Sequence, residues 1–101
     1  SPELAKEYGM SESVLFLYIA DRVRMREKAV RHFYKGAGLV RSTLREFSRC
    51  FPCWSAGTIQ RSLTNLKKKH LIRSTRLGPG DRTNWYMLTE KGRKTLIGLS
   101  E

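Results

Sequence analysis

Residues 50–72 read CFPCWSAGTIQRSLTNLKKKHLI, a helix-breaking turn followed by the pattern of an amphipathic helix. Pro52 cannot continue a helix, because it lacks an N–H and its ring clashes with the preceding turn. Ser55 is a residue type that caps helix N-termini well. Beyond it, apolar residues recur at a spacing that places them in one stripe of a helix. The pattern predicts a helix over about 55–69 that buries Ile59, Leu63, Leu66 and His70.

The opposite face of this helix is polar, and its N-terminal end carries small side chains. On a helical wheel that face and its flanks hold Gly57, Gln60, Arg61, Thr64, Asn65, Lys67 and Lys68. The lysines also lie near the helix C-terminus, where the helix dipole favours cations. The outward surface therefore combines amide, hydroxyl and cationic groups.

The sequence before this stretch predicts a long first helix over about 11–25, for which Ser11 is a suitable N-cap. Residues 3–9 can begin a helix, but Gly9 interrupts it. Residues 26–38 fit either a second short helix or an ordered loop. The apolar face of the first helix is expected to hold Val14, Leu15, Leu17, Tyr18, Ile19 and Val23.

A short strand and a short helix are expected between the two longer helices. Residues 39–41 are too few for periodicity to decide, but they fit a brief strand. The helix that follows covers about 43–49, with either Ser42 or Thr43 as its N-cap. Its expected buried residues are Leu44 and Phe47.

Two short strands and a final helix are expected after residue 70. The segments 71–76 and 82–88 flank residues 77–81 (LGPGD), a turn sequence typical of a β-hairpin. Thr89 is a suitable cap for a last helix over about 89–100. That helix has Leu96, Ile97 and Leu99 available for packing.

The resulting order is helix, strand, helix, turn, helix, hairpin, helix. This is the order of an α+β winged helix-turn-helix domain, in which a three-helix core carries a β-hairpin wing, here with a C-terminal helix. We expect one domain over residues 1–101, with its core at about 11–88. The helix at about 55–69 corresponds to the recognition helix, which enters the major groove, and the hairpin at about 71–88 corresponds to the wing.

The charge of the chain favours nucleic acid as a partner. The sequence has 20 Lys and Arg against nine Asp and Glu, which gives a formal net charge of +11. A domain this basic attracts polyanions. Its basic residues are spread over several expected elements, whereas a membrane-surface helix pairs a basic face with a wide apolar one. No apolar run is long enough to cross a membrane. We therefore expect double-stranded DNA as the partner and no membrane.

Particular residues of the helix and hairpin suit contacts with DNA. Gln60 can pair with adenine and Arg61 with guanine in the major groove. Thr58 and Thr64 can reach bases or phosphates, and the helix N-terminus favours a phosphate. Arginines of a wing usually touch the DNA backbone or the minor groove. The expected DNA-binding residues are Ser55, Ala56, Gly57, Thr58, Gln60, Arg61, Thr64, Asn65, Lys68, Arg73, Arg76 and Arg82.

Residues 51–55 read FPCWS, residues 58–63 read TIQRSL, and residues 81–86 read DRTNWY. These motifs resemble the F-P-F-W-S turn, the T-I-Q-R-x-[LI] recognition helix and the D-R-T-x-W-Y strand of phage and plasmid replication initiators. The match is to the N-terminal winged-helix domain of those proteins. The resemblance covers about residues 7–88 and implies a winged-helix fold and DNA binding.

Two positions depart from the initiator pattern. Cys53 stands where an aromatic residue is usual. His70 replaces the glycine that usually ends the helix. The helix must therefore end without a glycine cap or with a backbone conformation that is less common for other residues. Residues 88–93 (LTEKGR) are instead similar to the strand-to-helix passage of multidrug-response-type (MarR) and PadR-like regulators. Both resemblances imply DNA binding, and they leave open whether the domain initiates replication or regulates transcription.

Cys50 and Cys53 have the spacing of a redox pair or of half a zinc site. A zinc site needs two further ligands, and the histidines of the chain are His32 and His70. We expect two semi-buried thiols in a reducing cytoplasm instead. The sequence has no phosphate-binding glycine loop and no evident nucleophile–base pair, so we expect no enzymatic activity, no cofactor and no metal.

The rival interpretation is a winged-helix adaptor that binds a protein without binding nucleic acid. It predicts a neutral or acidic outward face on the helix at 55–69, whereas this face is basic. RNA is a less favoured partner than double-stranded DNA, because exposed aromatic side chains on which single-stranded bases could stack are not evident. The oligomeric state stays open, since the first helix or the last helix can supply the face of a homodimer.

Overall fold

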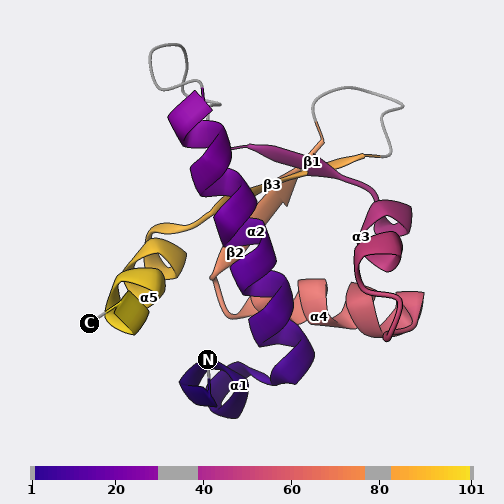
Figure 1. Cartoon of the computed structure of the whole chain (residues 1–101), viewed down its shortest axis with the longest axis horizontal. Helices are drawn as coiled ribbons and strands as arrows, with labels where there is room; N and C mark the ends of the chain where they lie inside the picture. Colours follow the sequence, from indigo (N-terminus) through magenta and orange to yellow (C-terminus); the bar gives the residue numbers. More distant parts are fainter. Residues whose placement is uncertain (1, 30–38, 77–82, 101) are drawn as a thin grey trace.

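The computed structural model describes residues 2–29, 39–76 and 83–100. Within these residues the chain forms a small α+β domain with helices around a three-stranded antiparallel sheet (Figure 1). The described elements are α1 (Pro2–Tyr8), α2 (Met10–Ala29), β1 (Val40–Ser42), α3 (Leu44–Cys50), α4 (Ala56–Lys68), β2 (Ile72–Thr75), β3 (Asn84–Leu88) and α5 (Glu90–Ser100).

The strands lie in the order β1-β3-β2, so β3 is central. In this register Trp85 of β3 lies opposite both Arg41 of β1 and Thr75 of β2. The brief strand predicted at 39–41 forms one residue later, as β1, and the two arms of the predicted hairpin form as β2 and β3. The turn predicted at 77–81 lies outside the described residues.

The central helix α2 is longer than the sequence predicts. The pattern predicts 11–25, whereas α2 also takes in the first four residues of the ambiguous segment 26–38; residues 30–38 lie outside the described part. The core lies between α2, α4 and the sheet, and α2 also packs on α1. Phe16, which the predicted apolar face omits, is fully buried. A helix with partners on several sides has no single apolar face, so periodicity finds part of its core.

The start of α2 corrects the predicted cap. Gly9 interrupts the N-terminal helix as expected: it has a φ of 106° and joins α1 to α2. Ser11 is not the N-cap, because α2 already begins at Met10. The Ser11 hydroxyl instead lies 2.7 Å from the Ser62 hydroxyl of α4, so it ties the two helices together.

Thr43, and not Ser42, is the N-cap of helix α3. The Thr43 hydroxyl accepts a hydrogen bond from the Glu46 N–H and donates one to the Glu46 carboxylate. Phe47 is buried as predicted, but Leu44 is 38% exposed, so the prediction that Leu44 is buried is wrong. The helix has seven residues, and only a narrow stripe of its surface, centred on Phe47, faces the core.

Helix α4 ends in a reversal that uses a left-handed residue, His70, with a φ of 61°. The His70 N–H donates to the Lys67 carbonyl and the Leu71 N–H donates to the Leu66 carbonyl, which is the Schellman pattern. His70 is exposed, because the reversal turns it out of the buried stripe, and the prediction that it is buried is wrong. The stripe is buried as predicted at Ile59, Leu63 and Leu66.

Helix α5 packs its first turn against this reversal. The Thr89 hydroxyl accepts a hydrogen bond from the Gly92 N–H, as the predicted cap requires, and donates one to the His70 carbonyl. Of the residues available for packing, Leu96 and Leu99 pack against the core, whereas Ile97 is 60% exposed. Successive residues of a helix point about 100° apart, so Ile97 leaves the face that Leu96 buries.

Gly92→Ala is expected to destabilise the protein by about 1–3 kcal/mol. A Cβ at Gly92 would lie 2.2 Å from the Leu71 carbonyl oxygen, so the backbone of α5 or of the reversal must move. Gly98→Ala is the matched control in the same helix, because its Cβ meets nothing within 4 Å. That change should stabilise the protein by up to about 1 kcal/mol. Urea unfolding measures both, and equal midpoints would contradict the close approach of α5.

Candidate nucleic-acid interface

Aromatic packing holds the turn before α4. Phe51 stacks on Trp54 with ring centroids 5.6 Å apart, and its ring meets Tyr18 of α2 edge-on at 5.1 Å. Ser55 then caps α4, as the sequence predicts, because its hydroxyl accepts a hydrogen bond from the Thr58 N–H at 3.1 Å. The turn therefore fixes where α4 begins and in which direction its N-terminus points.

The predicted site residues of α4 lie together on its outward face. Thr58 is half-buried. The exposed members are Ser55, Ala56, Gly57, Gln60, Arg61, Thr64, Asn65 and Lys68. A shallow, open depression on this face is lined by Gly57, Gln60, Arg61, Thr64, Asn65 and Lys68. The side chains that the sequence assigns to one surface are thus neighbours in space.

The hydroxyl groups at the N-terminal end of α4 organise the side chain of Arg61. Ser55 Oγ donates to Thr58 Oγ1 at 3.0 Å, and Arg61 Nη2 donates to the same oxygen at 3.3 Å. Thr58 thereby holds the guanidinium along the helix surface. A Cβ on the neighbouring Gly57 would lie 3.5 Å from Arg61 Nη1, an ordinary contact, so the protein itself has room for a side chain there.

Asn65 is exposed on this face, but its amide is bonded to α2. Asn65 Nδ2 donates to Glu12 Oε2 at 2.8 Å, and Ser11 Oγ donates to Glu12 Oε1 at 3.0 Å. Burial alone raises the pKa of the Glu12 carboxyl, but the hydrogen bonds from Asn65, the backbone and Ser11 outweigh it and hold the pKa below its ordinary value. Glu12 and Asn65 therefore clamp α4 to α2 with an ionised carboxylate.

The hairpin adds cations beside the end of α4. Arg73 of β2 and Arg76, which follows this strand, are both exposed. Lys67 Nζ donates to Ser74 Oγ at 3.3 Å, so the last turn of α4 is joined to β2. Arg82, the third predicted hairpin residue, lies outside the described part of the chain.

The cations of α4 and β2 keep their charge facing solvent. The ion pairs Arg93–Glu27 and Lys94–Glu90 lie on α2 and α5. No carboxylate of the described ranges pairs with Arg61 or Lys68, and the nearest carboxylate tied to α4, that of Glu12, is bonded to an amide. The surface is therefore positive and suits an anionic partner.

The sequence prediction omits a second group of exposed arginines, Arg41 of β1 and Arg45 and Arg49 of α3. Helix α3 packs directly on α4, and a spacing of four puts Arg45 and Arg49 on one side of it. That spacing is the sequence signal by which these two arginines could have been found.

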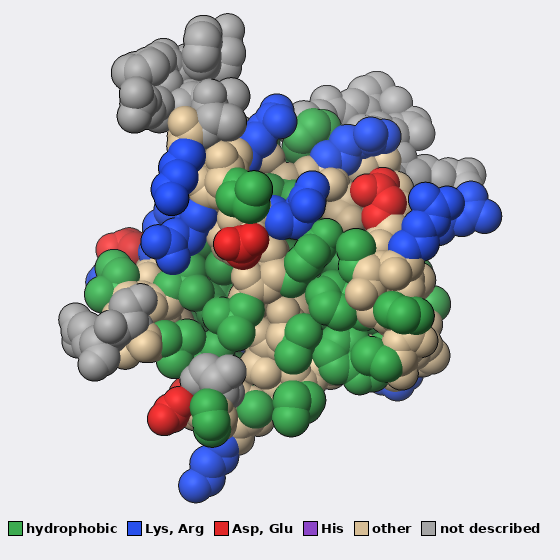
Figure 2. All heavy atoms as spheres, in the orientation of Figure 1, with side chains coloured by type: hydrophobic (Ala, Val, Ile, Leu, Met, Phe, Trp, Pro, Cys, Tyr) green, Lys and Arg blue, Asp and Glu red, His purple; other side chains and the backbone are tan. Residues whose placement is uncertain are grey.

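Most Lys and Arg side chains in Figure 2 lie over the upper half of the face, and hydrophobic side chains spread below them.

The two cysteines lie at the end of α3 and in the turn that follows it. Both Cys50 and Cys53 are free and exposed, so the prediction of semi-buried thiols is wrong; neither reaches the core. Cys50 Sγ lies 3.4 Å from the hydroxyl of Tyr18. In residues 2–29, 39–76 and 83–100 no three His, Cys, Asp or Glu side chains gather in a way that could hold a metal ion.

No protein-family model matches this sequence, and comparisons with curated proteins and with solved structures also give no match. None of the helices in the described ranges is long and apolar enough to cross a lipid bilayer.

Glu12→Gln is expected to remove a pH-dependent part of the stability. Because the folded pKa of Glu12 lies below its unfolded value, the carboxylate stabilises the fold above the unfolded pKa, about 4.3. This contribution is lost as the pH falls through the folded pKa. Solvent screens the partly exposed side chain, so the effect at neutral pH stays below about 1 kcal/mol.

Urea unfolding of both proteins between about pH 7 and pH 3 measures this term. The difference in unfolding free energy between wild type and Glu12→Gln should shrink on acidification. Met25→Gln, at an exposed position of the same helix that carries no titratable group, is the control and should give a difference that does not vary in this way. A constant difference for Glu12→Gln would mean that the charge of Glu12 adds nothing to the clamp.

Proposed function

We propose that this chain is a winged-helix domain that binds duplex DNA, with α4 in the major groove and the β2–β3 hairpin as the wing. The supporting observation is the outward face of α4, which is polar, basic and exposed from Ser55 to Lys68. An α-helix fits the major groove, which is about 12 Å wide. The order α2, β1, α3, α4, β2, β3 agrees with this assignment.

Gln60 and Arg61 are the proposed base readers. Both are exposed on α4, and their planar amide and guanidinium groups suit adenine and guanine edges respectively. Thr64, one turn further on, can add a hydroxyl contact. Asn65 acts instead as a positioning residue, because its amide is already bonded to Glu12.

Phosphate contacts are proposed at the N-terminus of α4 and on the elements beside it. The Ser55 hydroxyl accepts the hydrogen bond of the Thr58 N–H. The N–H groups of Ala56 and Gly57 are left to bind an approaching phosphate. Further cations can contact phosphates and position the helix without reading sequence. The exposed ones are Arg45 and Arg49 of α3, Lys68 at the end of α4, and Arg73 and Arg76 beside that end; Arg82, which is also proposed, lies outside the described residues.

The proposal covers a role in viral or plasmid DNA replication and a role in transcription regulation, because the same binding mode serves both. The adaptor interpretation has less support. It requires a neutral or acidic face on α4, and the helix sequence AGTIQRSLTNLKK contains no acidic residue.

Fluorescence anisotropy with a random-sequence duplex and its matched single strand, titrated across salt, tests the proposal. The duplex should bind more tightly, and log affinity should fall against log salt with a slope of about −4 to −7, as about five to eight neutralised phosphates give. Arg61→Ala should weaken binding to a selected site by about tenfold and relax its base preference. Lys6→Ala, exposed on α1, is the control and should leave binding nearly unchanged.

Absence of duplex binding at low salt, or equal affinity for the single strand, would overturn the proposal. If Arg61→Ala lost the same factor on selected and random duplexes, Arg61 would be a phosphate contact and not a base reader.

Gly57→Ala should separate folding from binding. The added Cβ has room beside Arg61, and alanine is the better helix former by up to about 1 kcal/mol, so the fold becomes at least as stable. On DNA the methyl group occupies space that the backbone needs, and binding should weaken by about fivefold, which corresponds to about 1 kcal/mol. Urea unfolding and anisotropy on the same sample measure both. Gly98→Ala should gain stability with no change in binding, and a Gly57→Ala protein that binds as wild type would refute close backbone approach.

A further inference from the structure

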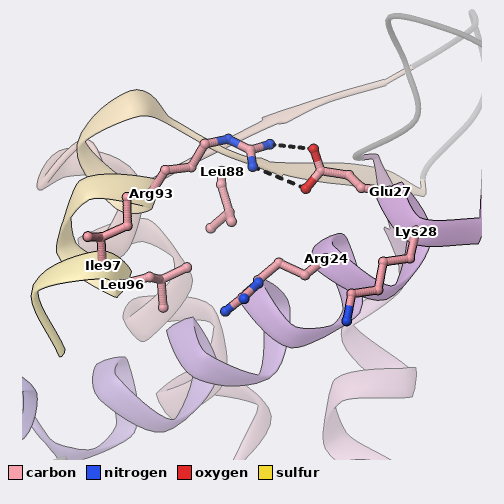
Figure 3. A pocket seen from close by; sticks show the side chains of 7 residues that line it. All are labelled: Arg24, Glu27, Lys28, Leu88, Arg93, Leu96 and Ile97. Atoms are coloured by element: carbon pink, nitrogen blue, oxygen red, sulfur yellow. Dashed lines mark hydrogen bonds and ion pairs between the residues drawn. The ribbon is translucent and has the colours of Figure 1, made fainter. Parts of the chain in front are cut away.

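A hollow of about 480 Å³ lies between the second half of α2 and α5, over the end of β3 (Figure 3). It belongs to neither α4 nor β2, so the proposed DNA surface does not account for it. Its lining residues are Arg24, Glu27, Lys28, Leu88, Arg93, Leu96 and Ile97. The volume is within the range of about 300–1,000 Å³ that small-molecule sites occupy.

The hollow has an apolar lining. Leu88 of β3 is buried beneath it, and Leu96 and Ile97 of α5 form one wall. Ile97 keeps 60% of its surface exposed, which is unfavourable for a large aliphatic side chain in water. An apolar group placed against these three residues would remove that surface from water.

The rim of the hollow carries an excess of positive charge. Glu27 is neutralised by Arg93, whose guanidinium donates two hydrogen bonds to it at 3.1 and 2.9 Å. Arg24 and Lys28 are one helical turn apart on α2, and no carboxylate in the described ranges pairs with them. In Figure 3, Arg24 extends from α2 toward Leu96 and Ile97, across the hollow from the Arg93–Glu27 pair.

We propose that this hollow binds a small organic anion, a monocarboxylate with an apolar tail. The tail lies against Leu88, Leu96 and Ile97, and the carboxylate lies between Arg24 and Lys28. Cations near the C-terminus of α2 also suit its helix dipole, but the dipole does not explain why they border an apolar hollow. A phosphodiester backbone or an inorganic anion would leave the apolar wall exposed, so the charge and the lining together select an amphipathic ligand.

Octanoate is the probe, titrated into isotope-labelled protein and followed by the methyl NMR signals. Saturable shifts are expected at Leu88, Leu96 and Ile97. Neutral 1-octanol and cationic octyltrimethylammonium should bind at least about fivefold more weakly, because they lack the charge-assisted contact. Arg24→Gln and Lys28→Gln should each weaken octanoate binding by about fivefold, the scale of one partly exposed ion pair. Arg22→Gln is the matched control, since Arg22 lies on α2 but lines a different hollow, and it should bind as wild type.

Equal binding of octanoate and octanol, or full binding by Arg24→Gln, would overturn the proposal. A second copy of the chain is the competing occupant, and sedimentation distinguishes it. A dimer that the exposed-site change Ile97→Lys dissociates, without octanoate shifts in the wild type, would assign the hollow to self-association. All these readouts are independent of DNA binding, so failure here leaves the proposed function untouched.

Discussion

At the reversal after α4 the chain turns back into the core and meets the start of α5. In it the left-handed His70 closes two hydrogen bonds onto α4 and turns Leu71 back into the core. The Leu71 carbonyl accepts the Thr89 N–H at 3.2 Å, and the His70 carbonyl accepts the Thr89 hydroxyl. Helix α5 therefore starts where α4 ends, and Gly92 is required by the closeness of the two backbones. A left-handed residue other than glycine costs about 1–2 kcal/mol, which these contacts offset.

The same reversal is one of three points at which α4 is held. The aromatic turn led by Phe51 fixes its N-terminus, and the hydrogen bond from Asn65 to Glu12 ties its second half to α2. Contacts at several points along the helix oppose its rotation about its own axis. Its outward face is thus oriented before a partner arrives, which lowers the ordering cost of binding. This orientation supports the proposal that Gln60 and Arg61 contact bases.

The sequence predicts α4, its cap and its outward face well, because these depend on residues a few positions apart. It fails where the partner is distant along the chain. Ser11 suits an N-cap by type, yet it bonds to Ser62 of another helix, and Asn65 suits a base contact by position, yet it bonds to Glu12. The burial of apolar residues such as Leu44 and Ile97 is overestimated for a related reason. The sequence does not show which face of a helix packs against another element. The exposed arginines of α3 are missed because their spacing of four places them on one side of a helix but does not show that α3 packs on α4.

The surroundings of the cations divide them into two groups that suit different anions. On α4 and β2, Arg61, Lys68 and Arg73 stand among polar side chains and exposed backbone, a surface that a hydrated polyanion can cover without burying apolar area. On α2, Arg24 and Lys28 border leucine and isoleucine side chains, where an anion gains most if it brings an apolar group with it. The net charge of +11 raises the affinity of both surfaces for anions and distinguishes neither. What separates their ligands is the apolar area beside the charge, and that area depends on how α5 is anchored at the reversal after α4.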